Sequence, residues 1–301
     1  MPNIYQNISS NKRDTVVIVS MFIVVITIIG WFIGEYFTEA GGYSMIGIAL
    51  IVSGLSGFFS YYNSDKLVLS VSNAKKVEYD NAPDLHKLVE NISIASGLPK
   101  PEVYVINDSS MNAFATGRDP EHGAVCLTTG IVQRLEKREL EGVIAHEMSH
   151  IGNYDTRLMS IVSILVGSVS LLADWFTRGL FFKRGRRSNN NNSSANGLLF
   201  LIGMVLIILS PIIATLIKLA ISRKREYLAD STAALITRYP KGLANALRKL
   251  GQDREVLEVA NSATAHLYIA DPIRSSLSGK ISNFFNTHPP IEERIRRLES
   301  M

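Results

Sequence analysis

His146 and His150 lie four residues apart, with Glu147 between them, in a stretch whose apolar residues recur at helical spacing. A spacing of four places both imidazoles on one face of a helix, where they can bind one metal ion. In such an arrangement the histidines hold zinc, and the glutamate takes a proton from a zinc-bound water whose pKa the metal lowers to about 7. The chain has only six histidines, so a chance match to this pattern has a probability of roughly one per cent. Two satisfied histidines on an ordinary helix are the alternative interpretation.

A catalytic zinc site of this kind requires a third protein ligand and keeps its fourth position for water or substrate. We predict Glu226 as that ligand, because it directly follows a long apolar run and few other acids lie so close after one. Asp230 comes one turn later on the same helix face. We predict that it accepts the N–H of a ligating histidine and so orients the ring. For either acid alone, a solvated charge on a helix surface is the ordinary alternative.

The elements that must position these residues begin with two apolar runs, Thr15 to Gly34 and Tyr43 to Tyr62. Each is nearly free of charge and has about 20 residues, the length that a helix needs to cross the hydrocarbon core of a bilayer. The link between them is short and contains Gly41 and Gly42, so the two runs predict a helical hairpin in the membrane. A cleaved signal peptide is the weaker alternative, because no small-residue cleavage site precedes the second run.

From Asp65 the composition is mixed and globular, and its patterns predict a small β-sheet among helices. The predicted segments, in order, are an alternating stretch from Lys66 to Ser72, a helix from Ala82 to Gly97, strands at Glu102 to Ile106, Asn112 to Gly117 and Gly123 to Thr128, and a helix from Lys137 to Ile151. The last helix carries the histidine motif, and Gly152 and Asn153 are its stop signals.

Two further apolar runs, Leu158 to Phe176 and Gly197 to Ile221, flank a basic and asparagine-rich insert at Arg178 to Asn196. The low complexity of the insert predicts disorder. These two runs contain charged residues or proline, so they either span the bilayer or enter it only partly. The chain after Arg223 is predicted to be soluble and helical.

Composition supports a membrane protein and argues against several other classes. Hydrophobic residues make up 47% of the 301-residue chain and charged residues only 19%, and the mean hydropathy is positive. The net charge is only +4, and the basic residues lie mostly beside the apolar runs. Anionic lipid headgroups are therefore a better-suited partner of these residues than nucleic acid. Cys126 is the only cysteine, which excludes an intrachain disulfide framework and a cysteine-rich metal cluster.

These patterns together predict a mainly α-helical membrane protein with a small β-sheet. We divide it into a transmembrane hairpin (1–64), a first catalytic part with the sheet and the zinc-binding helix (65–157), two membrane-associated segments with the insert (158–221), and a second catalytic part with the third zinc ligand (222–301).

Four stretches of the sequence resemble those of a known family: His146 to His150, Ser222 to Asp230, Thr287 to Ile295 and Asn112 to Gly117. With the order of the four apolar runs, they resemble the HtpX family of membrane zinc endopeptidases, relatives of the CAAX prenyl proteases. The resemblance implies a zincin-like catalytic domain of the gluzincin type on transmembrane helices, with one Zn²⁺ bound by His146, His150 and Glu226 and catalysis by Glu147. It also implies the degradation of misfolded membrane proteins. The asparagine-rich insert matches no family feature that we can assign.

The resemblance gives a meaning to His288 as well. It matches the family's His-Pro element, so we predict that it stabilises the developing oxyanion or positions the substrate. Without the resemblance, a histidine beside prolines is more often a loop residue. For Arg294, a pairing with an acid near the site and a solvated helix charge are both open.

The Asn112 to Gly117 stretch has the pattern of an exposed edge strand. An extended peptide that added to such an edge would be held by main-chain hydrogen bonds, which tolerate many sequences. We therefore predict that Asn112, Ala113 and Phe114 bind substrate. An ordinary hairpin strand is an equal alternative when the resemblance is set aside.

His150 precedes the third apolar run and Glu226 follows the fourth. If both residues bind one zinc ion, both ends of this pair of runs lie on the same side of the membrane. The pair must therefore cross the membrane twice or not at all. With the zinc site in the cytoplasm, seven basic residues face inward (Lys12, Arg13, Lys66, Arg157, Arg223, Lys224, Arg225) and five face outward (Arg178, Lys183, Arg184, Arg186, Arg187). The excess of basic residues favours a cytoplasmic active site at the plasma or inner membrane. The five charges of the insert conflict with it unless these runs do not fully span.

The function predicted from the sequence is a zinc-dependent endopeptidase that cuts unfolded polypeptides or exposed segments of membrane proteins. A processing protease with a narrow substrate, such as a prenylated or peptide precursor, is the nearest alternative. A non-catalytic membrane scaffold with structural zinc is the alternative from another class, and Glu147 argues against it. No nucleic-acid partner is predicted, and the oligomeric state stays open.

Overall fold

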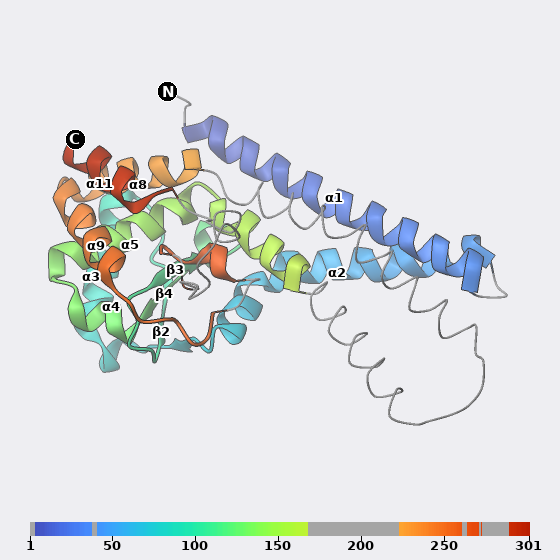
Figure 1. Cartoon of the computed structure of the whole chain (residues 1–301), viewed down its shortest axis with the longest axis horizontal. Helices are drawn as coiled ribbons and strands as arrows, with labels where there is room; N and C mark the ends of the chain where they lie inside the picture. Colours follow the sequence, from blue (N-terminus) through green and yellow to red (C-terminus); the bar gives the residue numbers. More distant parts are fainter. Residues whose placement is uncertain (1–3, 38–40, 168–222, 261–263, 271, 273–288) are drawn as a thin grey trace.

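The structure, a computed structural model, describes residues 4–37, 41–167, 223–260, 264–270, 272 and 289–301. A long helical hairpin extends from a compact domain in which helices surround a small sheet (Figure 1). The predicted insert, the fourth apolar run, the end of the third run after residue 167 and His288 lie outside the described residues.

Helices α1 (Ile4–Phe37) and α2 (Gly41–Val71) form the hairpin. Within them, the segments Ile8–Trp31 and Gly41–Val71 are long and apolar enough to cross a membrane. Small residues allow the two helices to approach closely, as where Gly30 of α1 faces Ala49 of α2. The prediction of two long apolar helices is confirmed.

α2 continues past residue 64, where the sequence places the end of the hairpin, to Val71. The alternating stretch from Lys66 to Ser72 is the pattern of a strand, yet it is helical almost throughout. The helical path buries Val68 and Leu69 in a cluster that they share with Ile18 of α1 and with the sheet. Tertiary burial therefore decides the local structure here, against the short-range pattern.

Four strands form the sheet in the order β1-β2-β4-β3. They are β1 (Lys75–Lys76), β2 (Glu102–Ile106), β3 (Ala113–Thr116) and β4 (Ala124–Thr128). β2 and β4 run parallel, and the other two pairs are antiparallel. The three predicted strands are confirmed, whereas the two-residue β1 has too short a pattern to be predicted.

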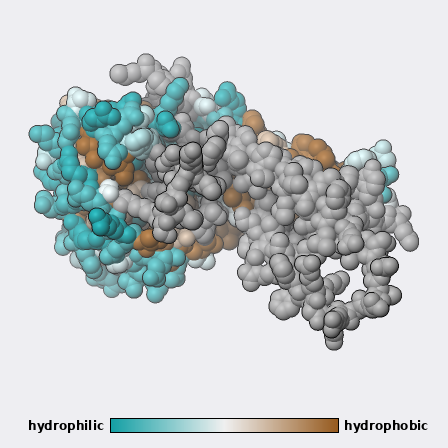
Figure 2. Space-filling model, viewed as in Figure 1, coloured by the Kyte–Doolittle hydropathy of each residue, from teal (hydrophilic) through white to brown (hydrophobic). Residues whose placement is uncertain are grey.

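Besides a helix at 155–167, six helices longer than five residues cover the described part of the compact domain. They are α3 (Pro83–Ser96), α4 (Thr129–Arg134), α5 (Lys137–Gly152), α8 (Arg223–Thr237), α9 (Pro240–Gln252) and α11 (Ile291–Glu299). On the face that Figure 2 shows, the described surface of this domain is mainly hydrophilic. α5 contacts α3, α8, α9 and β3, so the element with the histidine motif lies at the centre of the domain.

α5 begins and ends at clear local signals. Glu136 and Glu139 form a reciprocal capping box at its start. At its end, Tyr154 adopts a left-handed backbone conformation with φ of 61°, and a new helix starts at residue 155 and continues to 167. The sharp turn at Asn153 and Tyr154 therefore separates the histidine helix from the third apolar run.

Candidate metal centre

Two helices from distant parts of the sequence bring the predicted zinc ligands together. His146 and His150 lie on α5 and Glu226 lies on α8, and one ligand atom from each falls within 4.8 Å of the other two. All three side chains are buried. The structure thus brings Glu226 to the two histidines, although it lies 76 residues along the chain from His150.

Each imidazole is oriented by a carboxylate on its outer side. Asp230 Oδ1 lies 3.0 Å from His146 Nδ1, as predicted for this residue. Asp155 Oδ2 lies 3.0 Å from His150 Nδ1, a contact that sequence reasoning missed. A carboxylate in this position draws the proton to Nδ1 and directs the Nε2 lone pair of the ring inward.

The inward sides of the two rings fit a cation. The Nε2 atoms of His146 and His150 are 3.2 Å apart, and Glu226 Oε1 lies 3.4 Å from His150 Nε2. Two nitrogen lone pairs and a carboxylate that face one point repel each other unless a proton or a metal ion lies between them. Burial lowers the pKa of His150, but Asp155 and Glu226 raise it well above its usual value. Two imidazoles and one carboxylate are a donor set that suits zinc.

Arg294 of α11 is fully buried beside this cluster. Its Nε and Nη2 donate to both oxygens of Asp230, at 2.9 and 2.7 Å, and its Nη1 lies 3.4 Å from Glu226 Oε2. Burial raises the pKa of Asp230, but Arg294 and His146 outweigh it and bring that pKa down to about 2. Asp230 therefore stays ionised, as its contact with the imidazole requires.

The alternative of a solvated charge at Arg294 is wrong, and the sequence contains a signal for this. Arg294 lies three residues after Ile291 and four before Leu298, so it falls on the apolar face of an otherwise highly charged helix. A cation on the buried face of a helix needs a buried acid as its partner.

Glu147 lies on α5 next to the candidate ligands and is also buried. Desolvation raises its pKa to about 7, although His150 opposes this rise and a hydrogen bond from the backbone of Ala115 on β3 does so too. A carboxylate with a pKa near the working pH can both accept and return a proton. The local environment thus suits Glu147 to general acid–base work.

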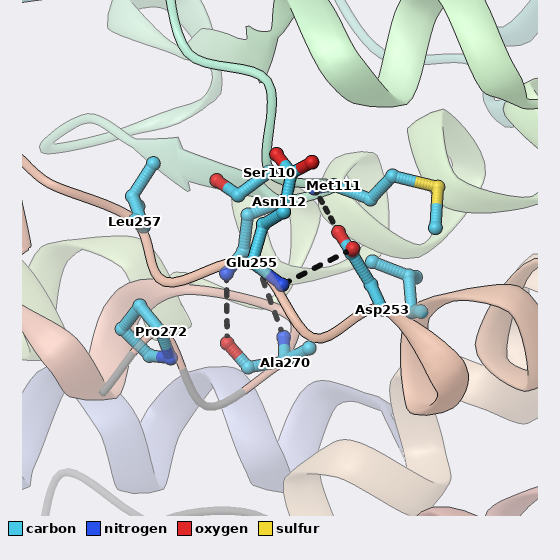
Figure 3. Close-up of a pocket in the computed structure, with 9 residues that line it drawn as sticks. Ser110, Met111, Asn112, Asp253, Glu255, Leu257, Ala270 and Pro272 are labelled. Carbon is cyan, nitrogen blue, oxygen red and sulfur yellow. Dashed lines mark hydrogen bonds between the residues drawn. The ribbon is translucent and has the colours of Figure 1, made fainter. Parts of the chain in front are cut away.

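The predicted substrate strand has the right place but the wrong exposure. β3 is an edge strand of the sheet, yet all four of its residues and Asn112 are buried. Ile269 N donates to Ala113 O at 2.9 Å, and the side chain of Asn112 exchanges two hydrogen bonds with the backbone of Ala270 (Figure 3). Phe114 packs against Tyr268 with ring centroids 5.1 Å apart.

The prediction of an exposed edge is therefore corrected, since residues 268–270 cover the outer side of β3. Sequence patterns could not reveal this cover, because it comes from a segment more than 150 residues away. A small polar pocket opens beside Asn112, between Ser110 and Asp253 (Figure 3). Met111 N donates to Asp253 there.

Comparisons with known proteins identify proteins that are similar to this chain. Residues 80–301 match the model of Peptidase family M48. A protease HtpX homolog from Dictyoglomus thermophilum is 42% identical over 297 residues, which cover 99% of this chain and 94% of that protein. A protease HtpX homolog from Ligilactobacillus salivarius is 43% identical over 299 residues, which cover 99% of this chain and 100% of that protein. The crystal structure of S. mikatae Ste24p is a remote structural neighbour, with 19% identity and a TM-score of 0.49, and the match covers 94% of this chain and 62% of that one.

Proposed function

This chain belongs to peptidase family M48 and, within it, to the HtpX proteases, so it is a metallopeptidase, and we propose that it is a zinc-dependent endopeptidase of the gluzincin type. One observation carries the proposal. His146, His150 and Glu226 converge within 4.8 Å of one another, directly beside the buried Glu147. A structural zinc site would normally have four protein ligands and no adjacent base.

In this proposal His146, His150 and Glu226 hold the ion. Zinc held there would supply Lewis acidity, which would polarise the scissile carbonyl and lower the pKa of a water molecule towards neutral pH. Glu147 takes the proton that the attacking water loses, and it later returns that proton to the leaving amine. Asp230 and Asp155 keep the two rings in the tautomer that turns Nε2 inward. Arg294 keeps Asp230 ionised.

The proposed substrates are unfolded polypeptides and exposed segments of membrane proteins. The two apolar helices support this, because they would hold the catalytic domain close to a bilayer. The basic residues beside the apolar runs support an active site that faces the cytoplasm at the plasma or inner membrane. His288 stays a predicted oxyanion or substrate-positioning residue. For Asn112, Ala113 and Phe114 to bind substrate along β3, residues 268–270 must first leave that edge.

The test is the cleavage of unfolded casein by the purified, zinc-loaded protein and by Glu147→Gln. Removal of a general base lowers turnover by about 10² to 10⁴-fold, while bound zinc should stay near one ion per chain. Glu121→Gln is the matched control, because it makes the same chemical change at an exposed position of the compact domain. A wild type that does not cleave casein in a zinc-dependent manner would refute the proposal.

The breadth of cleavage needs a separate measurement. We expect cleavage fragments of many different membrane proteins to be less abundant in cells that carry Glu147→Gln than in cells that carry the wild type. A single discrete substrate in this comparison would replace the broad quality-control role with that of a narrow processing protease.

A further inference from the structure

A side chain of the first apolar helix reaches the candidate metal centre. Asn11 of α1 lies one turn before the apolar run that starts at Thr15, and it is buried against the compact domain. Its Nδ2 donates to Asp155 Oδ1 at 2.7 Å and to the carbonyl of Asn153 at 2.8 Å. Its Oδ1 accepts from Arg225 Nη1 at 3.0 Å. Both donors of this amide group and its oxygen thus bond to the compact domain.

Two of the three partners of the Asn11 side chain lie next to candidate zinc ligands. Asp155 accepts from Asn11 with one carboxylate oxygen and faces His150 Nδ1 with the other, at 3.0 Å. Arg225 directly precedes Glu226 and lies 3.8 Å from Asp155. One amide from α1 therefore joins the carboxylate behind the second histidine to the residue before the third ligand.

The same end of α1 also holds the turn that follows the histidine helix. Tyr154 occupies a left-handed conformation that is unfavourable for a tyrosine, so surrounding contacts must hold it in place. The ammonium of Lys12 lies 4.3 Å from the centre of the Tyr154 ring, and Asn11 is bonded to Asn153. The position of Asp155 beside His150 depends on this turn.

We propose that Asn11 is a positioning residue of the metal centre. Through Asp155 it sets the orientation of His150, so the seating of the first apolar helix determines how tightly the centre binds zinc. This inference rests on the proposed zinc site and adds that the membrane hairpin takes part in building it. The hairpin is then more than an anchor, because a helix that shifts along its axis moves Asn11 away from Asp155.

A buried asparagine can also be merely structural, and the two roles differ in what they change. A structural Asn11 contributes to unfolding free energy but leaves the orientation of His150, and hence zinc affinity, unaltered. A positioning Asn11 changes zinc affinity and does so only while Asp155 is present. The affinity of zinc therefore separates the two roles, and activity is not needed to measure it.

The experiment measures zinc affinity by competition with a chelator, in full-length detergent-solubilised protein that carries Glu147→Gln to prevent proteolysis. Asn11→Leu keeps the branched shape of the side chain and removes every side-chain hydrogen bond. Loss of an outer partner typically weakens metal binding 10 to 100-fold, and Asn11 is one contact further away, so we expect a rise in Kd of about 3 to 10-fold. Thr15→Val is the matched control, because it removes a buried hydrogen bond of the same helix, to the carbonyl of Asn11, without touching Asp155.

A double-mutant cycle with Asp155→Asn tests the route. That change alone should raise the zinc Kd about 10 to 100-fold, and Asn11→Leu should add no further loss in its presence because both act on the same contact. If Asn11→Leu does not fold, Asn11→Asp replaces it, since it keeps the shape and the acceptor for Arg225 but brings a second negative charge against Asp155. It should weaken zinc binding at least as much.

A zinc Kd for the Asn11 variants within twofold of that for Thr15→Val would overturn the inference. The inference would also be overturned if the effects of Asn11→Leu and Asp155→Asn on the free energy of zinc binding were fully additive, because Asn11 would then act independently of Asp155. A parent protein that binds no zinc would overturn the proposed function and this inference together. A parent that binds zinc, with Asn11→Leu unchanged, refutes the inference alone.

Discussion

Large apolar side chains lie exposed along the apolar runs of the helical hairpin, whereas in the compact domain they fill the core. In the hairpin, large apolar residues such as Ile28, Leu55 and Phe58 are about two-thirds exposed, whereas Ser53 and Ser60 are buried. In the compact domain, apolar residues fill the core, and a cluster of charged residues is buried with them. This reversal is expected of a region whose solvent is lipid, where burial of apolar surface provides no driving force.

The buried polar groups of the two regions also differ in where their partners lie. In the hairpin, the hydroxyls of Thr15 and Ser53 donate to carbonyls four residues earlier in their own helices. At the metal centre, Asp230 pairs with Arg294, 64 residues away. Asn11, which precedes the apolar run of α1, pairs there with Asp155, 144 residues away. Local bonds make a polar residue tolerable in lipid, while long-range bonds build a unique site.

The largest loss of unfolding free energy that tests this comparison is expected on substitution of Arg294. Arg294→Met leaves Asp230 and Glu226 without their guanidinium, and removal of one partner from a buried ion pair costs roughly 3 to 5 kcal/mol. Denaturant unfolding of the purified protein measures this loss. Arg248→Met is the control, since its pair with Glu299 is exposed and such pairs contribute about 1 kcal/mol or less. Equal losses would show that long-range buried pairing does not hold the compact domain.

The next effect is a pH dependence at Glu147. Burial raises the pKa of this carboxyl from 4.5 to about 7 in the folded, metal-free protein, so the folded state prefers the protonated form. Glu147→Gln should therefore stabilise the metal-free protein above pH 7, on the order of 3 kcal/mol, and the gain should fade as pH drops towards 4.5.

Thermal unfolding of the two metal-free proteins at pH 5 and pH 8 measures this difference, with Glu121→Gln as the exposed control. A gain that is the same at both pH values would contradict the raised pKa. The hairpin offers no comparable carboxyl among its described residues, because Asp14, Glu35 and Asp65 are not buried.

A smaller effect tests how the hairpin is held together. A methyl group added at Gly30 would lie 2.6 Å from Ala49 Cβ, so Gly30→Ala must push α1 and α2 apart. We expect a loss of about 1 to 3 kcal/mol, the usual cost of overpacking. Gly54→Ala is the matched control on α2, because nothing lies within 4 Å of the added methyl. Helicity followed during thermal unfolding in detergent distinguishes them, and equal stability of both variants would argue against close helix contact.

The smallest effect is expected on the outer face of the hairpin. Leu55→Ala should change unfolding free energy in bilayer-like detergent by about 0.5 kcal/mol or less, because Leu55 is 65% exposed and lipid contacts replace its own. Leu247→Ala, at a fully buried position of α9, should cost about 2 to 5 kcal/mol. A large loss at Leu55 would show that this face is covered by protein rather than by lipid.

Local patterns were enough to predict most of the regular structure. Helical spacing identified α3 and α5, and β-branched and aromatic residues between turn residues identified β2, β3 and β4. The extension of α2 to Val71 escaped prediction, because the contacts of Val68 and Leu69 that bury it come from other segments. The packing of residues 268–270 against β3 was not predicted either, because these residues are also distant in the sequence.

By itself the sequence determined that two imidazoles lie on one helix face with Glu147 beside them, and that two apolar helices precede them, because both features depend on spacing along one segment. It also named Glu226 and Asp230, on the chemical ground that the site needs a third ligand and an outer carboxylate. Only the tertiary structure decided that Asp155, Arg294 and Asn11 meet there. Such meetings depend on how distant elements pack, and a repeat of 3.6 or 2 residues contains no information about packing partners.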